Sequence, residues 1–163
     1  MIFVTIGSMF PFDRLIREMD RWANDNRRYD VFAQIGNGDY IPANMDYVRK
    51  LSQSDFTYTM AKAEVIVAHA GMGTVITAGQ IGTPLVLLPR IHAWGEHTSD
   101  HQIATANWLR DKPRVFLADT DADLSRAIQL ALQTGKDGAD RFSDKADPAF
   151  TNRLRTAILD YMR

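Results

Sequence analysis

The stretch EVIVAHAGMGTVITAGQIGTPLVLLP, residues 64–89, decides the fold. It predicts a buried strand, a glycine-rich turn at 69–74, a helix of small residues and, after Gly82-Thr83-Pro84, a second buried strand at 85–88. In an open parallel sheet, the turn after a strand lies at the carboxyl edge, where ligands bind, and it leads into the N-terminus of a helix. The stretch therefore predicts an anion site at this edge.

The rest of the chain repeats the alternation of strand and helix. Strands are expected at 2–6, 29–35, 48–51, 64–68, 85–89 and 115–117, and helices at 12–24, 54–63, 74–80, 100–109 and 121–132. This order predicts an α/β fold, a Rossmann-like open and mostly parallel sheet with helices on both faces. Trp22 and Trp108 lie within the helical segments and are expected in the core.

Length and composition favour a single domain. The 163 residues include 45% hydrophobic and 24% charged residues, which is typical of globular proteins. A net charge of -1 argues against a nucleic-acid partner, and the absence of cysteine excludes disulfides and thiolate chemistry and favours the cytoplasm. The first residues enter a strand at once, with no apolar run long enough for a signal or a membrane span.

We expect a nucleotide-sugar-binding domain at 1–134 and a second segment at 135–163. Residues 135–147 (GKDGADRFSDKAD) are charged and rich in turn formers, which predicts an exposed linker. Apolar residues then recur at helical intervals from Phe150 to Tyr161. This C-terminal helix either belongs to the same domain or contacts a partner.

The turn His69-Ala70-Gly71-Met72-Gly73-Thr74 has the composition of a phosphate site. Its glycines let phosphates approach backbone N–H groups, Thr74 can cap the helix and donate a hydroxyl, and the His69 ring can donate as well. The same pattern also arises where a strand and a helix of small residues simply pack tightly. Both interpretations stay open for these residues alone.

All four histidines lie between positions 69 and 101, on two consecutive strand-to-helix connections. The second connection is the polar loop 91–102, IHAWGEHTSDHQ. Such clustering at one sheet edge favours a site for a polar ligand over an ordinary polar surface loop. Trp94, beside a glycine in this loop, is expected to cover a ligand or to touch a partner.

A metal site is the alternative explanation for the same loop. His97 and His101 are four residues apart, with Glu96 and Asp100 beside them. The regular helix that this spacing needs begins only near Ser99, so we expect no metal. Asp100 is better explained as the N-cap or first-turn acid of the next helix.

A second glycine turn follows the first strand. Gly7 and Ser8 can form a backbone cradle on the opposite half of the sheet. An ordinary connection between strand and helix explains them equally well.

Three segments together resemble the C-terminal domain of the family 28 type glycosyltransferases. They are residues 2–15 (IFVTIGSMFPFDRL), the turn 69–74, and Gly95-Glu96-His97 with Asp100-His101-Gln102. The likeness covers about 1–132 and is strongest to the single-domain subunits of bacterial exopolysaccharide glycosyltransferases. The chain is similar, more distantly, to the catalytic subunit of the eukaryotic dolichol-linked N-acetylglucosamine transferase and to the donor half of the peptidoglycan enzyme.

This resemblance implies half of a two-domain GT-B architecture, with a nucleotide-sugar donor across the carboxyl edge of the sheet. The implied donor-binding residues are Gly7, Ser8, Leu51, Ser52, His69, Gly71, Gly73, Thr74, Thr77, Glu96, His97, Asp100, His101 and Gln102. The resemblance implies that the diphosphate is held by His69, Gly71, Gly73 and Thr74. The nucleobase would lie near the backbone of Leu51 and Ser52. The sugar and the diphosphate would also face Glu96, His97, Asp100, His101 and Gln102. Thr77 stands where more distant relatives carry a ribose-gripping glutamate. Enzymes of this architecture use no metal.

The resemblance implies transfer of a sugar from a UDP-sugar to a lipid-linked acceptor, with inversion and without a cofactor, in exopolysaccharide or related glycan synthesis. His69 is expected to stabilise the departing diphosphate. No residue is assigned as the general base that removes the proton from the acceptor hydroxyl. A lone donor half implies a membrane-anchored partner subunit that binds the lipid-linked saccharide and holds the chain at the inner face of the membrane. A non-catalytic regulatory subunit and a sugar-nucleotide epimerase or hydrolase are the alternatives.

Overall fold

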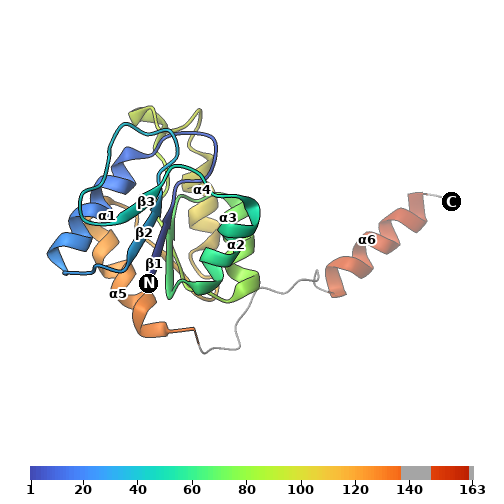
Figure 1. Ribbon diagram of the computed structural model, residues 1–163. Coiled ribbons are helices and arrows are strands. Elements are labelled where there is room, and N and C mark those ends of the chain that lie inside the picture. The colour runs from blue at the N-terminus through green and yellow to red at the C-terminus, as the bar shows by residue number, and fades with distance from the viewer. Residues whose placement is uncertain (137–147, 162–163) are drawn as a thin grey trace.

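A six-stranded sheet forms the centre of the protein (Figure 1). The computed structural model describes residues 1–136 and 148–161. The strands are β1 (Ile2–Thr5), β2 (Val31–Gln34), β3 (Asp46–Val48), β4 (Val65–Ala68), β5 (Leu85–Leu87) and β6 (Val115–Leu117). The helices are α1 (Asp13–Asp25), α2 (Gln53–Lys62), α3 (Met72–Ile81), α4 (His101–Leu109), α5 (Leu124–Thr134) and α6 (Pro148–Tyr161), with 3-10 turns η1 (His92–Trp94) and η2 (Asp121–Asp123).

Every strand pair in the sheet is parallel, and the order is β3-β2-β1-β4-β5-β6. The strand β1 lies at the centre, with Ile2 opposite both Val31 and Val65. The chain winds outward from β1 in one direction as far as β3, then returns beside β1 as β4 and continues the other way. Ligands of such sheets bind where the order reverses, between β1 and β4. The predicted α/β, Rossmann-like fold is confirmed.

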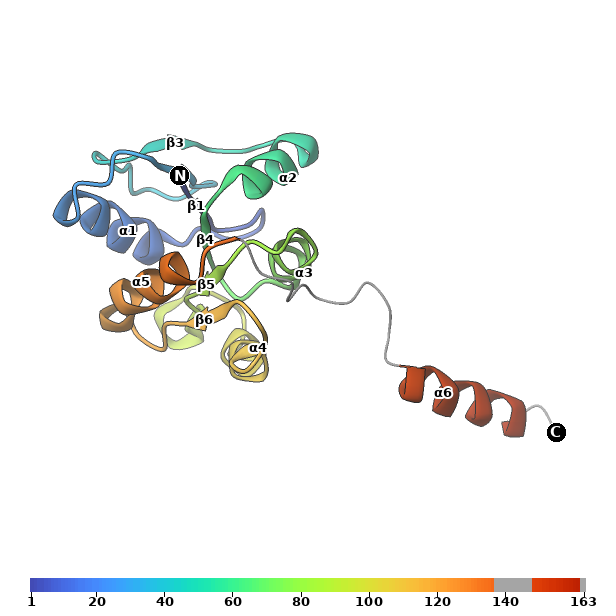
Figure 2. The ribbon, with the colours of Figure 1, turned by 90° about the horizontal axis from the view of Figure 1, so that it is seen from below.

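Helices cover both faces of the sheet, as Figure 2 shows: α1 and α5 lie on one side, and α2, α3 and α4 on the other. Strand residues alternate between the two layers because their side chains point to opposite faces. In β4, Val65 and Val67 pack with α1 and α5, whereas Ile66 and Ala68 pack with α2, α3 and α4. Both faces of each central strand are therefore buried, which explains the unbroken apolar runs.

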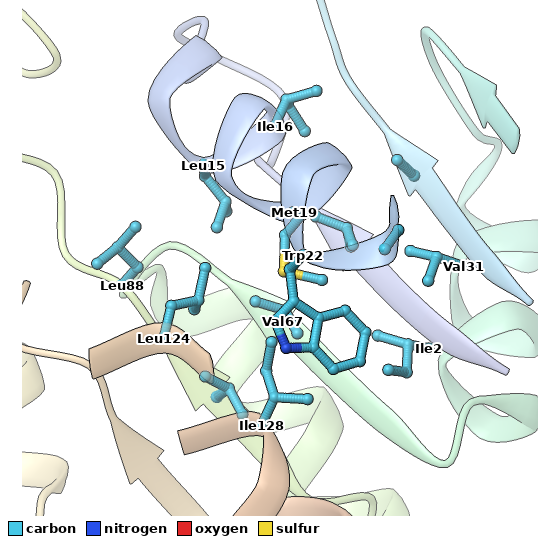
Figure 3. Close-up of a cluster of buried hydrophobic side chains, with 14 of the residues drawn as sticks. Ile2, Leu15, Ile16, Met19, Trp22, Val31, Val67, Leu88, Leu124 and Ile128 are labelled. Carbon is cyan, nitrogen blue, oxygen red and sulfur yellow. The ribbon is translucent and has the colours of Figure 1, made fainter. Parts of the chain in front are cut away.

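The two helix-face tryptophans have different surroundings. Trp22 of α1 is 7% exposed and packs among the apolar side chains of the layer that includes α5 (Figure 3), as expected. The prediction of a buried Trp108 is wrong, since its side chain is 63% exposed. Helix α4 turns Ala106 and Leu109 toward the sheet, which leaves Trp108 on the outer side, where Lys112 lies over its ring.

The third strand occurs slightly earlier than the predicted 48–51, at Asp46–Val48. Its hydrogen bonding to β2 ends at Arg49, whose carbonyl accepts from the Gly36 N–H. Ser52 then caps α2, because its hydroxyl accepts from the Asp55 N–H. This cap places residues 50–52 at the carboxyl edge of the sheet.

Helix α5 ends at Thr134, and the expected division of the chain near this residue stays a prediction. The predicted linker lies mostly outside the described residues, which resume at Pro148. The predicted C-terminal helix is present as α6, and all of its described residues are exposed; it stands apart from the sheet in Figures 1 and 2. Within residues 1–136 and 148–161, no helix is both long enough and apolar enough to cross a membrane.

Candidate functional site

A pocket of about 530 Å³ opens at the carboxyl edge of the sheet, where the chain order reverses. It brings together most of the predicted site residues: Gly7, Ser8, Leu51, Ser52, His69, Gly71, Gly73, Thr74, Thr77, His97 and Gln102. Three predicted residues, Glu96, Asp100 and His101, do not line it. Turns that are far apart in the sequence meet here because parallel strands end at the same edge.

The imidazole of His69 lies between two glycines from different strands. A Cβ atom on Gly7 would lie 2.6 Å from His69 Cε1, and a Cβ atom on Gly71 would lie 2.2 Å from His69 Nε2. Both distances are too short for real atoms, so neither position accepts a side chain while the ring stays in place. Gly7 also has a positive φ of 75°, which glycine adopts without strain. These two glycines therefore make room for the ring.

Burial keeps the His69 ring neutral. It lowers the pKa of His69 to about 4, and the nearby positive charge of Arg90 acts in the same direction, while the Thr5 backbone opposes both. The His69 Nδ1 atom is buried and makes no hydrogen bond of normal distance and angle with the described residues. A neutral imidazole carries one N–H donor and one acceptor, so this ring can donate to an anion in the pocket.

Helix α3 points its N-terminus at the pocket. Gly71 is its N-cap, and the N–H groups of the following turn have no acceptor within the helix. These N–H groups and the helix dipole favour an anion. Thr74, expected as a possible cap, instead lies inside the first turn with its side chain buried.

The second glycine of the turn differs from the first. A Cβ atom on Gly73 would have no neighbour within 4 Å, although Gly73 lies within α3 and lines the pocket. Glycine inside a helix costs about 0.5–1 kcal/mol relative to alanine. Packing within the chain does not require glycine here, and Gly73 is one of the residues that line the pocket. Gly73 thus has the surroundings of a position that a ligand approaches.

Thr5 and Gln34 fix the neighbouring wall of the pocket. The buried Thr5 hydroxyl donates to Gln34 Oε1 at 2.7 Å. Gln34 Nε2 in turn donates to the carbonyl oxygens of Gly7 and Arg49, both at 3.1 Å. This amide therefore holds the turn after β1 against the segment that follows β3.

Residues 51–52, where the nucleobase of the donor is expected, lie at the start of α2. Leu51 and Ser52 line the pocket, as do Lys50 and Phe56. Thr77 lines it from α3, and its hydroxyl donates to the Gly73 carbonyl at 2.8 Å. The position expected to face a ribose therefore carries a hydroxyl that is already engaged within its own helix.

Arg90 is the largest of the fully buried side chains among the described residues, with 2% exposure, and it lies three residues after the end of β5. Its guanidinium donates to the carbonyl oxygens of Ile6, Phe10, Pro11 and Glu96, and it lines the pocket. Burial lowers the pKa of Arg90 to about 10, a value at which the group is still charged at neutral pH.

Glu96 is held by Arg14 and not by the pocket. Arg14 Nε and Nη2 donate to its two carboxylate oxygens at 2.7 and 2.8 Å, and the Ile91 N–H donates to Oε2 at 2.9 Å. Arg14 also pairs with Asp121. The Arg14 guanidinium lies 4.8 Å from the ring centre of Trp94, which is 61% exposed. Glu96 therefore shapes the loop, and its proposed contact with a sugar stays a prediction.

The loop histidines contact one another at the mouth of the pocket. The His97 ring lies 5.1 Å from that of Phe10 and 4.4 Å from that of His101. Partial burial lowers the pKa of His97, and the neighbouring positive groups add to this. His101 Nδ1 is 2.8 Å from the Ser99 hydroxyl.

Asp100 is the N-cap of α4, as expected, but its carboxylate accepts from the His92 N–H at 2.9 Å and not from the helix. Gln102 is buried in the first turn, where its Oε1 accepts from the Arg90 N–H at 3.2 Å. In the described residues, no group of three or more His, Asp or Glu side chains is arranged to hold a metal ion.

The sequence reasoning missed Arg90, Gln34, Lys50 and Phe10. Arg90 and Gln34 each lie at the end of an apolar strand, which is a signal that sequence alone contains. The lining includes the cationic Lys50 and Arg90 and no aspartate or glutamate among the described residues. The pocket therefore favours a negatively charged ligand.

Comparison with known proteins agrees with this geometry. Residues 1–112 match the Glycosyltransferase family 28 C-terminal domain. The chain is 28% identical over 123 residues to a UDP-N-acetylglucosamine–N-acetylmuramyl-(pentapeptide) pyrophosphoryl-undecaprenol N-acetylglucosamine transferase of Psychromonas ingrahamii. That match covers 69% of this chain and 34% of the relative, so the chain spans about a third of its length.

Solved structures share the fold. The glycotransferase of kitacinnamycin superposes with a TM-score of 0.60 at 20% identity, over 95% of this chain and 37% of that one. The solution structure of ALG13 superposes with a TM-score of 0.57 at 16% identity, over 94% of both chains. The family match covers more than half of the 163 residues of the chain. The chain belongs to the glycosyltransferase family 28 C-terminal domain family.

Proposed function

We propose that this chain is the donor-binding and catalytic subunit of a glycosyltransferase that moves a sugar from a UDP-sugar to a lipid-linked acceptor. The observation that carries the proposal is the pocket at the β1–β4 edge, where His69 and the N-terminus of α3 face a cavity with cationic lining residues and no carboxylate among those described. The family and the Psychromonas relative, whose name states a UDP-sugar and an undecaprenol-linked acceptor, support the substrate class.

The pocket suits the departure of a nucleoside diphosphate. As the bond between the sugar and the diphosphate breaks, negative charge builds up on the diphosphate oxygens. Backbone N–H groups of the first turn of α3 and the neutral His69 ring can donate to those oxygens, and the charge of Arg90 lies close by. Inversion at the anomeric carbon and a reaction without a metal ion are part of this proposal.

The acceptor side requires a partner in our proposal. A membrane-anchored subunit would bind the lipid-linked saccharide, supply the base that removes the acceptor proton, and hold this chain at the cytoplasmic face of the membrane. The contact would include α6, on which Phe150, Leu154 and Ile158 recur every four residues and are each about half exposed, at 51%, 50% and 51%. The biological role would be exopolysaccharide or related glycan synthesis.

The first test measures binding of UDP to the purified chain by calorimetry. We expect binding that weakens at least tenfold in the variant His69→Ala, with Tyr29→Ala as a matched control, since Tyr29 is 86% exposed and does not line the pocket. A chain that binds no UDP would favour the regulatory subunit instead. Consumption of a UDP-sugar without any acceptor would favour an epimerase or hydrolase.

The second test addresses the partner. A Leu154→Glu variant places a charge on the apolar side of α6, whereas Thr156→Glu places the same charge on the opposite side. We expect that only Leu154→Glu abolishes co-purification with the proposed membrane-anchored subunit. Full acceptor glycosylation by the purified chain alone would contradict the need for a partner.

A further inference from the structure

We propose that Arg90 is the positioning residue of the pocket: its buried guanidinium holds the turn after β1 and the loop after β5 in the arrangement that binds the donor diphosphate. The inference deepens the proposed function, and its binding test rests on that function. Neither the family match nor the sequence analysis assigns a role to this residue.

The hydrogen bonds of Arg90 join the turn after β1 to the loop after β5. Nη2 donates to the Ile6 and Phe10 carbonyl oxygens, both at 2.8 Å, and Nη1 donates to the Pro11 carbonyl. Nη1 also donates to the Glu96 carbonyl at 3.2 Å, in the loop that carries His97. One planar group thus fixes two loops that are about 80 residues apart in the chain.

The surroundings make this arrangement rigid. Arg90 is 2% exposed, and its guanidinium carbon lies 4.6 Å from the ring centre of Phe12. Its own N–H donates to Gln102 Oε1 at 3.2 Å, which ties the same residue to the first turn of α4. A buried charge is tolerated only where its donors are satisfied, and carbonyl oxygens satisfy them here without cancelling the charge.

The positions that Arg90 fixes are those that face the ligand. Gly7 and Phe10 belong to the held turn and line the pocket, and Gly7 lies against the His69 ring. His97 follows the held Glu96 carbonyl and also lines the pocket, and its ring lies 5.1 Å from that of Phe10. The guanidinium itself also lines the pocket, so it adds positive charge beside the proposed diphosphate. A lysine would keep this charge but could not reach four carbonyl oxygens in one plane.

The test compares Arg90→Lys with Arg114→Lys. Arg114 is a matched control, because its Nη1 also donates to two backbone carbonyl oxygens, those of Gly82 and Gly135 at 2.9 and 2.8 Å, at the opposite edge of the sheet. We expect both variants to melt at a lower temperature. Only Arg90→Lys should weaken UDP binding, by at least tenfold, and raise amide hydrogen exchange in residues 6–10 and 91–97.

Unchanged UDP affinity and unchanged exchange in a folded Arg90→Lys variant would overturn the proposal. If the wild-type chain binds no UDP, the proposed function fails, and the exchange comparison alone still decides the role of Arg90. If Arg90→Lys does not fold, the wild-type protein supplies the measurement: the guanidinium protons of Arg90 should exchange more slowly with solvent than those of the exposed Arg110. Equally fast exchange would overturn the proposal.

Discussion

Replacing Gly71 and Gly73 by alanine tests whether the two glycines of the central turn have different roles. In Gly71→Ala the new Cβ atom would lie 2.2 Å from His69 Nε2, whereas ordinary contact begins at 3.4 Å. The His69 ring or the turn must therefore shift by about 1.2 Å. In Gly73→Ala the new methyl group meets no atom within 4 Å.

The magnitude follows from this geometry. Forcing an extra methyl group into a packed site costs about 1–3 kcal/mol. Both variants share the gain of about 0.4–1 kcal/mol that alanine brings by restricting the unfolded chain. We therefore expect Gly71→Ala to be about 2 kcal/mol less stable than Gly73→Ala, a difference of about 4–8 °C in melting temperature for a chain of this size.

Thermal unfolding followed by circular dichroism measures this difference, and calorimetry with UDP measures the consequence for the site. Gly73→Ala should match or exceed the wild-type melting temperature and still bind UDP at least tenfold more weakly, because Gly73 lines the pocket and the added methyl group would take up open space there. Equal melting temperatures for the two variants would refute the steric role of Gly71. Unchanged UDP affinity in Gly73→Ala would refute the ligand role of Gly73.

Further predictions concern His69, Glu96 and Thr77. Because the pKa of His69 is about 4 in the folded state and about 6.5 in the unfolded state, the unfolded chain binds the proton first, and the free energy of unfolding should fall by about 2–3 kcal/mol between pH 7 and pH 4.5. Urea unfolding at the two pH values measures this loss of stability, which should be about 2–3 kcal/mol smaller in His69→Gln than in the wild-type protein. An equal loss in both proteins would contradict the prediction. Glu96→Gln weakens a bidentate, mostly buried pair with Arg14 and should lower the melting temperature by about 2–6 °C, whereas Asp119→Asn, in an exposed pair, should leave it unchanged. Thr77→Glu should raise the affinity for UDP over 2′-deoxy-UDP by about tenfold if this position faces the ribose, and an unchanged ratio would exclude that. EDTA should leave UDP affinity unchanged, and loss of binding would indicate a metal.

The sheet could be predicted because its signals are local. Each strand is a short apolar run, and each turn that follows it contains a glycine or a polar cluster. In a parallel sheet these turns meet at one edge, so the proximity of Gly7, His69 and His97 follows from strand order alone. The same rule brings the turns at 7–8 and 69–74 and the loop 91–102 to one edge, whereas Leu51, Ser52 and Thr77 were assigned from the family resemblance.

Buried charged residues could not be predicted in this way. Asp20 occupies a charged position of α1, yet it is 3% exposed, because its carboxylate accepts from the Tyr40 hydroxyl and from the N–H groups of Ala43 and Asn44. Arg90 is buried by carbonyl oxygens that are about 80 residues away. The partners that make such burial tolerable come from distant segments, and a local pattern contains no trace of them.

Individual roles within the loop depend on distant partners in the same way. Glu96 was expected to face a sugar, but Arg14, 82 residues earlier, holds both of its carboxylate oxygens. Trp108 was expected in the core on helical spacing, and its exposure depends on which side of α4 the sheet contacts. The residues at the site were therefore easier to predict than their partners.

The central position of β1 determines when the pocket can form as the protein folds. Ile2 pairs with Val65, so the two strands that frame the pocket are 63 residues apart in the chain. Closing so long a loop is slow, because its entropy cost comes before the free energy that is gained when the two strands pair. A nascent chain that has emerged only as far as α2 contains neither His69 nor its turn. Ligand binding can therefore protect the finished domain against unfolding, but it cannot assist the early steps of folding.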